Sequence, residues 1–310
     1  MPRLAAPVCD CARYRRRIGD LCAGLRAHPY RQSELFVRQA ALAGDELPRG
    51  LRGALHDFRL NGNRDGYLLL RGLPISPERG AEACLALIGS RLGAIAGYAQ
   101  EKKGALFHDI VPQRSEEDRQ SAASSKAALA LHTERCFHPF LPSHVLLACV
   151  RPDPGRAALT VIASVRRMLP GIPDRWLPVL RRPLFRTGID YSFGNVTAQK
   201  ANGPVMSVLY GSRSDPCLRY DLDLMDGLTV PARAALGAVA RAAQRACIGV
   251  PLAAGDLLVI DNRRAVHGRT AFVARYDGRD RWLKRAYLVS DLTAAAADCR
   301  PGERVIRTRF

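Results

Sequence analysis

Short apolar segments separated by turns that contain Gly and Pro follow one another from about residue 104 toward the C-terminus. The clearest of them are HVLLACV at 144–150, ALTVIASV at 158–165, GDLLVIDN at 255–262 and RWLKRAYLVSD at 281–291. Segments of this length and spacing are typical of the β-strands of a sandwich or barrel. One helical segment interrupts the series, at about 229–249. We therefore expect a mainly β core with flanking helices, an α+β fold.

The N-terminal third of the chain has a different pattern. Apolar residues recur at helical spacing in three segments, and a strand and a fourth helix follow, giving the expected elements 10–28, 33–43, 47–62, 66–75 and 76–93. We expect one domain over 1–310, in which an N-terminal helical segment at 1–64 precedes a β-rich core at 65–310 with an inserted helix.

The sequence shows no feature of a membrane or secreted protein. It contains no run of 18 or more apolar residues, so no transmembrane helix is expected. The N-terminal residues MPRLAAPVCDCARYRRRIGD place their charges after a short, broken apolar run, unlike a signal peptide. We therefore expect a cytoplasmic protein without a membrane partner.

The chain is strongly basic, with a formal net charge of +18 from 47 basic and 29 acidic residues. A charge of this size raises nucleic acid as a partner. However, only five of the basic residues are Lys, and the arginines are scattered or lie in short runs such as RYRRR at 13–17. An anionic small molecule fits the charge equally well. We expect a small-molecule partner and no nucleic acid.

The nine cysteines are dispersed and odd in number, and none forms a CxxC pair. This pattern argues against a disulfide framework and against a zinc ribbon. Cys9 and Cys11 could offer two sulfurs to a metal, which is half a site at best. Burial as small apolar residues is the favoured interpretation for most of the nine.

The segment LALHTE places an imidazole and a carboxylate two positions apart. If it is a strand, His132 and Glu134 point to one face and Thr133 to the other. His267, which follows the apolar run GDLLVID, is the best candidate for a third ligand. Two His and one carboxylate form the facial triad of non-heme Fe(II) oxygenases, which leaves positions open for a co-substrate and O₂. A bare His-x-Glu pair also arises often by chance.

A second set of polar residues follows His267. Arg281 lies fourteen residues beyond it, and a guanidinium pairs bidentately with a carboxylate. On a strand, Arg281, Arg285 and Tyr287 share one face. Buried arginines without partners are rare, so a dianionic ligand would explain two arginines that face the core.

Two blocks, HTERCFHPFLPSHVLLACVRPDPGRAALTVIASV and GDLLVIDNRRAVHGRTAFVARYDGRDRWLKRAYLVSDL, resemble the clavaminate synthase-like group of Fe(II)/2-oxoglutarate oxygenases. That group includes bacterial asparagine and arginine β-hydroxylases, and the similarity runs from about residue 65 to 293. It implies a double-stranded β-helix, the cupin-like jelly roll, with Fe(II) on His132, Glu134 and His267. It also implies that Arg281 and Thr160 hold 2-oxoglutarate and that O₂ is the second co-substrate.

Four residues match this group more loosely. Glu101 and Arg285 fall where relatives contact the head group and the carboxylate of an amino-acid substrate. Asp221 and Asp223, which we expect to share a strand face, resemble the acidic residues that grip the substrate side chain in arginine hydroxylases. A structural role is the alternative for each: a helix cap or lid salt bridge for Glu101, and pairing with Arg for the aspartates.

Two residues close to Glu134 have other expected roles. His138 is expected to be structural and to hold the turn at Pro139. Arg135 departs from the resemblance, because relatives commonly carry an acidic or amide residue directly after the Glu ligand. A cation at this place is expected to alter the charge preference for the substrate.

These observations predict an Fe(II)/2-oxoglutarate-dependent dioxygenase. We expect it to hydroxylate an unactivated carbon of an amino acid or amino-acid derivative in a specialised-metabolite pathway, such as antibiotic biosynthesis. A carrier-bound or other natural product, with hydroxylation, desaturation or cyclisation, is the alternative within the same chemistry. A metal-free basic binding protein is the remote alternative. The polar stretch at 112–127 is long enough to be a mobile lid over the site.

Overall fold

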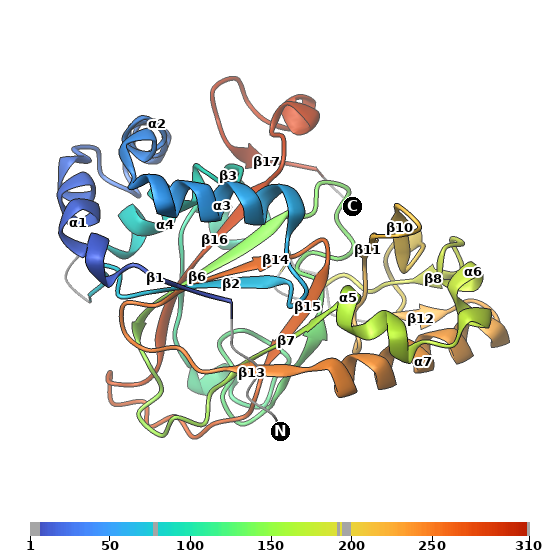
Figure 1. Cartoon of the computed structure of the whole chain (residues 1–310). Helices are drawn as coiled ribbons and strands as arrows, with labels where there is room; N and C mark the ends of the chain where they lie inside the picture. The colour runs from blue at the N-terminus through green and yellow to red at the C-terminus, as the bar shows by residue number, and fades with distance from the viewer. Residues whose placement is uncertain (1–6, 77–79, 191–192, 194–199, 309–310) are drawn as a thin grey trace.

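A computed structural model of the chain describes residues 7–76, 80–190, 193 and 200–308 (Figure 1). Two β-sheets form its centre. The major sheet contains, in spatial order, β1 (Val8–Asp10), β2 (Tyr67–Arg71), β14 (Leu257–Asp261), β6 (His144–Arg151), β16 (Trp282–Val289), β3 (Ala94–Tyr98) and β17 (Val305–Ile306), with β4 (His108–Ile110) also paired to β16. The minor sheet contains β13 (Ile248–Val250), β7 (Thr160–Ser164), β15 (Ala265–Arg269) and β5 (Leu129–His132).

Helices cover the outer faces of both sheets (Figure 1). On the major sheet lie α1 (Arg15–Gly24), α2 (Ser33–Ala43), α3 (Arg49–Asn61) and α4 (Ala81–Gly89). On the minor sheet lie α5 (Val165–Met168), α6 (Leu177–Leu180) and α7 (Val230–Ala246). Near these helices are two small sheets, one of β8 (Phe185–Arg186), β9 (Val205–Met206) and β12 (Asp226–Gly227), the other of β10 (Leu209–Gly211) and β11 (Pro216–Leu218).

The alternation of side chains along the strands explains this order of layers. In β6, Leu146 and Ala148 pack with the N-terminal helices, whereas Val145 and Leu147 belong to the core that the two sheets share. Successive residues of a strand point to opposite faces, so a strand that is apolar at every position is buried on both sides. The chain therefore has a helix–sheet–sheet–helix arrangement, and the shared core is also where the polar site lies.

The expected mixture of a strand-rich core and flanking helices is confirmed, but several boundaries were wrong. Val8–Asp10 is a strand that pairs in parallel with β2, although it lies in the N-terminal segment 1–64 that was predicted to be helical. The strand predicted at 66–75 ends at Arg71, because Gly72 follows with a φ of +77°. The helix predicted at 76–93 begins only at Ala81, after Gly80 at a φ of +90°, and part of its predicted first turn, 77–79, lies outside the described residues.

The inserted helix was predicted closely. It is α7, and the Thr229 side chain caps it by accepting a hydrogen bond from the Ala232 amide. Within the described part of the chain, no helix has both the length and the apolar character that crossing a membrane requires.

Candidate metal centre and active site

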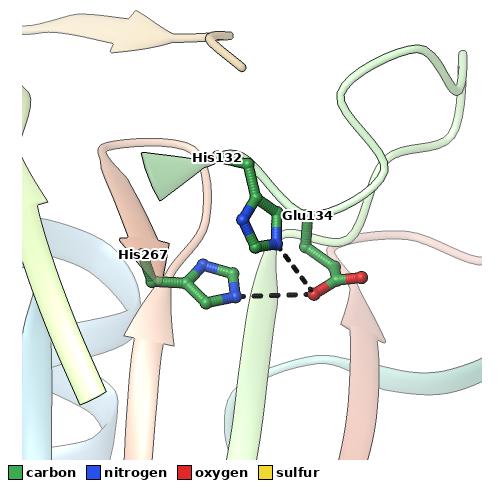
Figure 2. Close-up of side chains that lie close together, drawn as sticks. All are labelled: His132, Glu134 and His267. Carbon is green, nitrogen blue, oxygen red and sulfur yellow. Dashed lines mark ion pairs between the residues drawn. The ribbon is translucent and has the colours of Figure 1, made fainter. Parts of the chain in front are cut away.

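The structure brings His132, Glu134 and His267 together, although they are far apart in the sequence. β5 and β15 are antiparallel neighbours in which His132 and His267 are paired in register. One Glu134 oxygen lies 3.8 Å from His132 Nε2 and 3.4 Å from His267 Nε2, as Figure 2 shows. One donor atom of each residue lies within 4.8 Å of the others. These separations fit three ligands around one ion with bonds of about 2 Å.

Glu134 was expected on the same strand as His132, but the structure places it after the end of that strand. β5 ends at His132, and Glu134 is in the turn that follows. The buried Asn262 fixes this turn: its Oδ1 accepts a hydrogen bond from the Glu134 amide at 2.8 Å, and its Nδ2 donates to the Glu134 carbonyl at 3.0 Å. The carboxylate thus reaches the same face as His132 through a clamped turn. Asn262 was not among the site residues predicted from the sequence.

Hydrogen bonds orient the three side chains. His132 Nδ1 is 2.8 Å from the Ala130 carbonyl, so an N–H at Nδ1 donates there and leaves Nε2 facing Glu134. The Tyr287 hydroxyl donates to Glu134 Oε1 at 2.9 Å, which leaves Oε2 toward the imidazoles. Such outer contacts fix the direction in which a metal ligand presents its donor atom.

The electrostatics of the triad suit a cation. Burial tends to raise the pKa of Glu134, but Arg285 and the two imidazoles outweigh it and hold this pKa well below its usual range. Burial lowers the pKa of His267. For His132, burial is outweighed by the Glu134 carboxylate, which raises the pKa to about 9. The triad therefore combines an anionic carboxylate with two imidazoles, and the raised pKa of His132 shows that this place favours a positive charge. A divalent ion would supply that charge.

The triad opens into a cavity of about 320 Å³ that also exposes Arg281 and Thr160. Arg281, directly before β16, is only 7% exposed, and among the described residues no hydrogen bond or ion pair to its guanidinium is found. Burial lowers its pKa to about 10. The buried Thr160 hydroxyl, on β7, also lacks a hydrogen-bond partner there. Buried polar groups are normally satisfied, so these two indicate a polar ligand, and a carboxylate fits both.

Glu101 and Arg285 also face this cavity, and they bind each other. Arg285 Nη2 lies 2.6 Å from Glu101 Oε1, and a guanidinium nitrogen of Arg135 contacts the other oxygen of Glu101. All three side chains are buried. A helix cap or a lid salt bridge was the structural alternative for Glu101. The structure shows instead two ion pairs inside the cavity, one with Arg285 and one with Arg135. His138, which accepts a hydrogen bond from the Phe140 amide at 3.0 Å, holds the turn as predicted.

The prediction that Asp221 and Asp223 share a strand face was wrong. Asp221 makes an isolated bridge to His132, and Asp223 is exposed in the turn that follows. The Asp221 carboxylate accepts hydrogen bonds from the amides of Asp223 and Leu224 at 3.0 and 2.8 Å. Asp is favoured in such turns because its side chain binds the backbone two residues on. Asp221 thus stabilises its own turn, and neither aspartate pairs with Arg in the described structure.

Arg269 connects the polar segment at 112–127 to the site, a role that sequence reasoning missed. It is buried on β15, two residues after His267, and its guanidinium donates to the Ser124 hydroxyl at 2.6 Å and the Ala127 carbonyl at 2.7 Å. Residues of the same segment, including Gln113 and Gln120, line the cavity. The period-two spacing after His267 was the available signal, because it places Arg269 on the same strand face.

Comparisons with known proteins agree with this geometry. Residues 51–287 match the family described as taurine catabolism dioxygenase TauD, TfdA family. The chain is 35% identical to clavaminate synthase 2 of Streptomyces clavuligerus, over 93% of this chain and 94% of that protein.

Two solved structures are also similar over nearly the whole chain. Asparagine oxygenase in complex with Fe(II), 2S,3S-3-hydroxyasparagine and succinate superposes with a TM-score of 0.89 at 31% identity, covering 98% of this chain and 100% of that one. The non-heme iron oxygenase OrfP in complex with Fe and alpha-ketoglutaric acid gives 0.85 at 30% identity, covering 97% and 100%. The resemblance predicted from the sequence is confirmed: this chain belongs to the taurine catabolism dioxygenase TauD, TfdA family.

Proposed function

We propose that this protein is an Fe(II)/2-oxoglutarate-dependent dioxygenase that hydroxylates an unactivated carbon of an amino acid or amino-acid derivative in bacterial specialised metabolism. The observation that carries the proposal is the presence, in one cavity, of a His–Glu–His triad and of a buried arginine that no described residue pairs with. The triad suits ferrous iron, and the arginine suits the far carboxylate of 2-oxoglutarate.

Each residue then has a definite role. His132, Glu134 and His267 hold the metal, Arg281 and Thr160 hold 2-oxoglutarate, and Arg285 meets a carboxylate of the substrate. Bound ferrous iron supplies the oxidising chemistry, in which 2-oxoglutarate and O₂ are converted to succinate and CO₂ while one oxygen atom enters a C–H bond of the substrate. The protein positions that bond and, with the segment at 112–127, keeps water from the site.

The two facing sheets support a further structural proposal. They share one continuous apolar core, and both contribute residues to the cavity. We infer that they form a double-stranded β-helix, so that 1–310 is one oxygenase domain with 1–64 as its N-terminal segment. Nine unpaired cysteines and a need for ferrous iron favour a reducing compartment, the cytoplasm.

The experiment is a panel of amino acids and their derivatives, incubated with the protein, Fe(II), 2-oxoglutarate and ascorbate. We expect substrate-dependent succinate release and a product heavier by one oxygen atom. A protein that binds neither metal nor 2-oxoglutarate under anaerobic conditions would contradict the proposal and favour a metal-free binding protein.

A further inference from the structure

Two cysteines of the N-terminal helices, Cys22 and Cys84, are in contact in the apolar core that these helices form with the major sheet. Their sulfur atoms are 3.7 Å apart, a contact between α1 and α4 that joins residues 62 positions apart in the sequence. Cys84 is fully buried, and Cys22 is half-buried. Neither lines the cavity that contains the metal triad. Two thiols in contact, one of which solvent reaches, form a candidate site of oxidation.

The two helices differ in how firmly the structure holds them. In α4, every residue from Ala83 to Gly89 is buried, and Glu82 anchors the helix to β16 through an ion pair with Lys284 at 2.8 Å. In α1, only Ile18 and Leu21 are buried, and the last two residues are exposed. The end of α1 can therefore shift toward a fixed α4.

The shift that a disulfide requires is small. A disulfide bond is about 2.05 Å long, so the two sulfurs must approach by about 1.7 Å from their separation of 3.7 Å. Rotation of the Cys22 side chain, together with a slight movement of the last turn of α1, supplies this approach. The sequence separation of the pair means that the bond would close a long loop of the chain.

Cys9 and Cys11 are the competing pair in the same core. A hydrogen bond with Cys11 lowers the pKa of Cys9 to about 7. However, residues two apart on a strand have Cα atoms about 6.6 Å apart, close to the upper limit of about 6.8 Å for a disulfide. The Cys11 amide also donates to the Arg71 carbonyl at 2.8 Å, which fixes this backbone in the sheet. The geometry therefore favours Cys22 and Cys84.

The surroundings of the two sulfurs set the order of the chemical steps. A hydrogen bond with Cys22 and burial raise the pKa of the Cys84 thiol, so Cys84 stays protonated and Cys22 reacts first. The Cys22 thiolate attacks an oxygen of hydrogen peroxide, the O–O bond breaks, and a sulfenic acid forms while the released hydroxide takes up the proton that Cys22 had lost. The Cys84 sulfur then attacks the sulfenic sulfur. The S–S bond forms as the S–O bond breaks, and the leaving hydroxide takes the Cys84 proton. Two thiols lose two electrons and two protons, and one peroxide becomes two waters.

We propose that Cys22 and Cys84 are a site of reversible oxidation, at which a peroxide forms a disulfide that joins α1 to α4. The bond restricts the unfolded chain and so stabilises the folded one. It would lie among the helices on the outer face of the major sheet (Figure 1), whereas the cavity lies on the other face, so we expect metal binding to be unchanged. The inference does not depend on the proposed function.

The test treats the full-length protein, prepared without iron, with hydrogen peroxide. Free thiols are then alkylated, and tryptic peptides are mapped by mass spectrometry without reductant. The two cysteines lie on separate peptides, 18–26 and 80–91, whereas the competing pair shares one peptide, so the two pairings give different masses. We expect 18–26 joined to 80–91, and separation of the two by dithiothreitol. Alkylation of both cysteines when other thiols are oxidised, or a link from either to a third cysteine, overturns the proposal.

Thermal unfolding measures the effect of the bond. We expect the oxidised wild type to melt about 5 °C above the reduced protein. Cys22→Ser should show no such difference. Cys217→Ser, at a half-buried position on β11 outside this core, is the matched control and should show the wild-type difference. Each variant is compared with its own reduced form, so a change in its basal stability does not affect the result. A rise of similar size in the Cys22 variant overturns the assignment.

Hydrogen exchange locates the effect within the fold. Amides of α1 should exchange more slowly in the oxidised protein, while those of α7 should be unchanged. The Kd for Mn(II) should be the same before and after oxidation. Equal slowing in both helices, or a weaker affinity for Mn(II) in protein that carries the bond, overturns a local connection that is separate from the metal site.

Discussion

His132 and His267 are cross-strand partners, with ring centroids 4.6 Å apart on neighbouring antiparallel strands of the minor sheet. The backbone hydrogen bonds of β5 and β15 therefore set the distance between two of the three candidate metal ligands. Glu134 joins them from a turn, and the Asn262 side chain forms hydrogen bonds with both the backbone N–H and the backbone C=O of Glu134. The geometry of the triad thus depends on backbone pairing and on one buried amide side chain.

Replacing His267 with Ala should remove metal binding. A partner of a metal ligand contributes about 10- to 100-fold to affinity, so loss of the ligand itself should weaken Fe(II) or Mn(II) binding by more than about 100-fold. Metal content after anaerobic dialysis measures this. His56→Ala, at an exposed helical position, is the matched control and should bind metal as the wild type does. Retained metal in the His267 variant would contradict the triad.

Arg281→Met should have opposite effects on ligand binding and on stability. The Kd for 2-oxoglutarate should rise by at least about 30-fold, since loss of one member of a buried charge pair costs at least about 2 kcal/mol. The ligand-free protein should melt at a higher temperature, because an unpaired buried cation has been removed. Thermal unfolding with and without 2-oxoglutarate measures both effects. Exposed Arg279→Met should change neither.

Tyr287→Phe should weaken metal binding without removing it. The hydroxyl donates to Glu134 Oε1 at 2.9 Å, so its loss frees the carboxylate to rotate. We expect about tenfold lower affinity for Mn(II), measured by competition with a chelator. Tyr98→Phe loses a hydrogen bond of similar length, 2.7 Å to the Phe140 carbonyl, but does not touch Glu134. Equal effects of the two substitutions would argue against orientation of the carboxylate by Tyr287.

Arg269→Ala should loosen the segment at 112–127. The guanidinium is bonded to Ser124 and Ala127, and the Ala127 amide in turn donates to the Glu117 carbonyl at 3.0 Å. Hydrogen exchange of amides in this segment should become faster, while exchange in α7 stays unchanged. An opened lid should also allow more 2-oxoglutarate consumption without product. Unchanged exchange in 112–127 would show that other contacts hold the segment.

The stability of the protein should fall in mild acid. Burial lowers the pKa of His144 from 6.5 to about 4, so below pH 6.5 the unfolded chain binds a proton that the folded chain excludes. His144 therefore contributes stability above pH 6.5 that is lost as the pH falls toward 4, up to about 3 kcal/mol. Urea unfolding of the wild type and of His144→Gln should show a smaller pH slope in the variant. His56→Gln, at an exposed position, should keep the wild-type slope.

The triad and Arg281 could be predicted because two blocks of the sequence resemble a known family, although Glu134 reaches the site from a turn and not from the expected strand. Alternation put Arg281, Arg285 and Tyr287 on one face of a strand, and that face lines or contacts the cavity. The same reasoning failed for Asp221 and Asp223, because local Asx hydrogen bonds turn the backbone there and end the alternation.

Other features depended on contacts that are distant in the sequence. The strand Val8–Asp10 exists because it pairs with β2, in which each paired residue is 61 positions further along the chain, and three residues carry too short a pattern to indicate that partner. Arg135 was identified as unusual, but its ion pair with Glu101 depends on the position of two separate turns. Local sequence patterns determine where the helices and strands form, whereas tertiary contacts of this kind determine which charged groups meet in the site.

The two candidate imidazole ligands belong to the minor sheet, whereas Arg281 directly precedes β16 of the major sheet and Arg285 lies within that strand. A 2-oxoglutarate molecule that binds the metal at one end and Arg281 at the other would connect the two sheets. The spacing of the sheets then decides the reach of the guanidinium, and this spacing is maintained by apolar side chains such as Leu258 and Ile162. Replacing one of these interior side chains with a smaller one would therefore lower the rate of turnover as well as the stability of the fold, although the side chain is remote from any reacting atom.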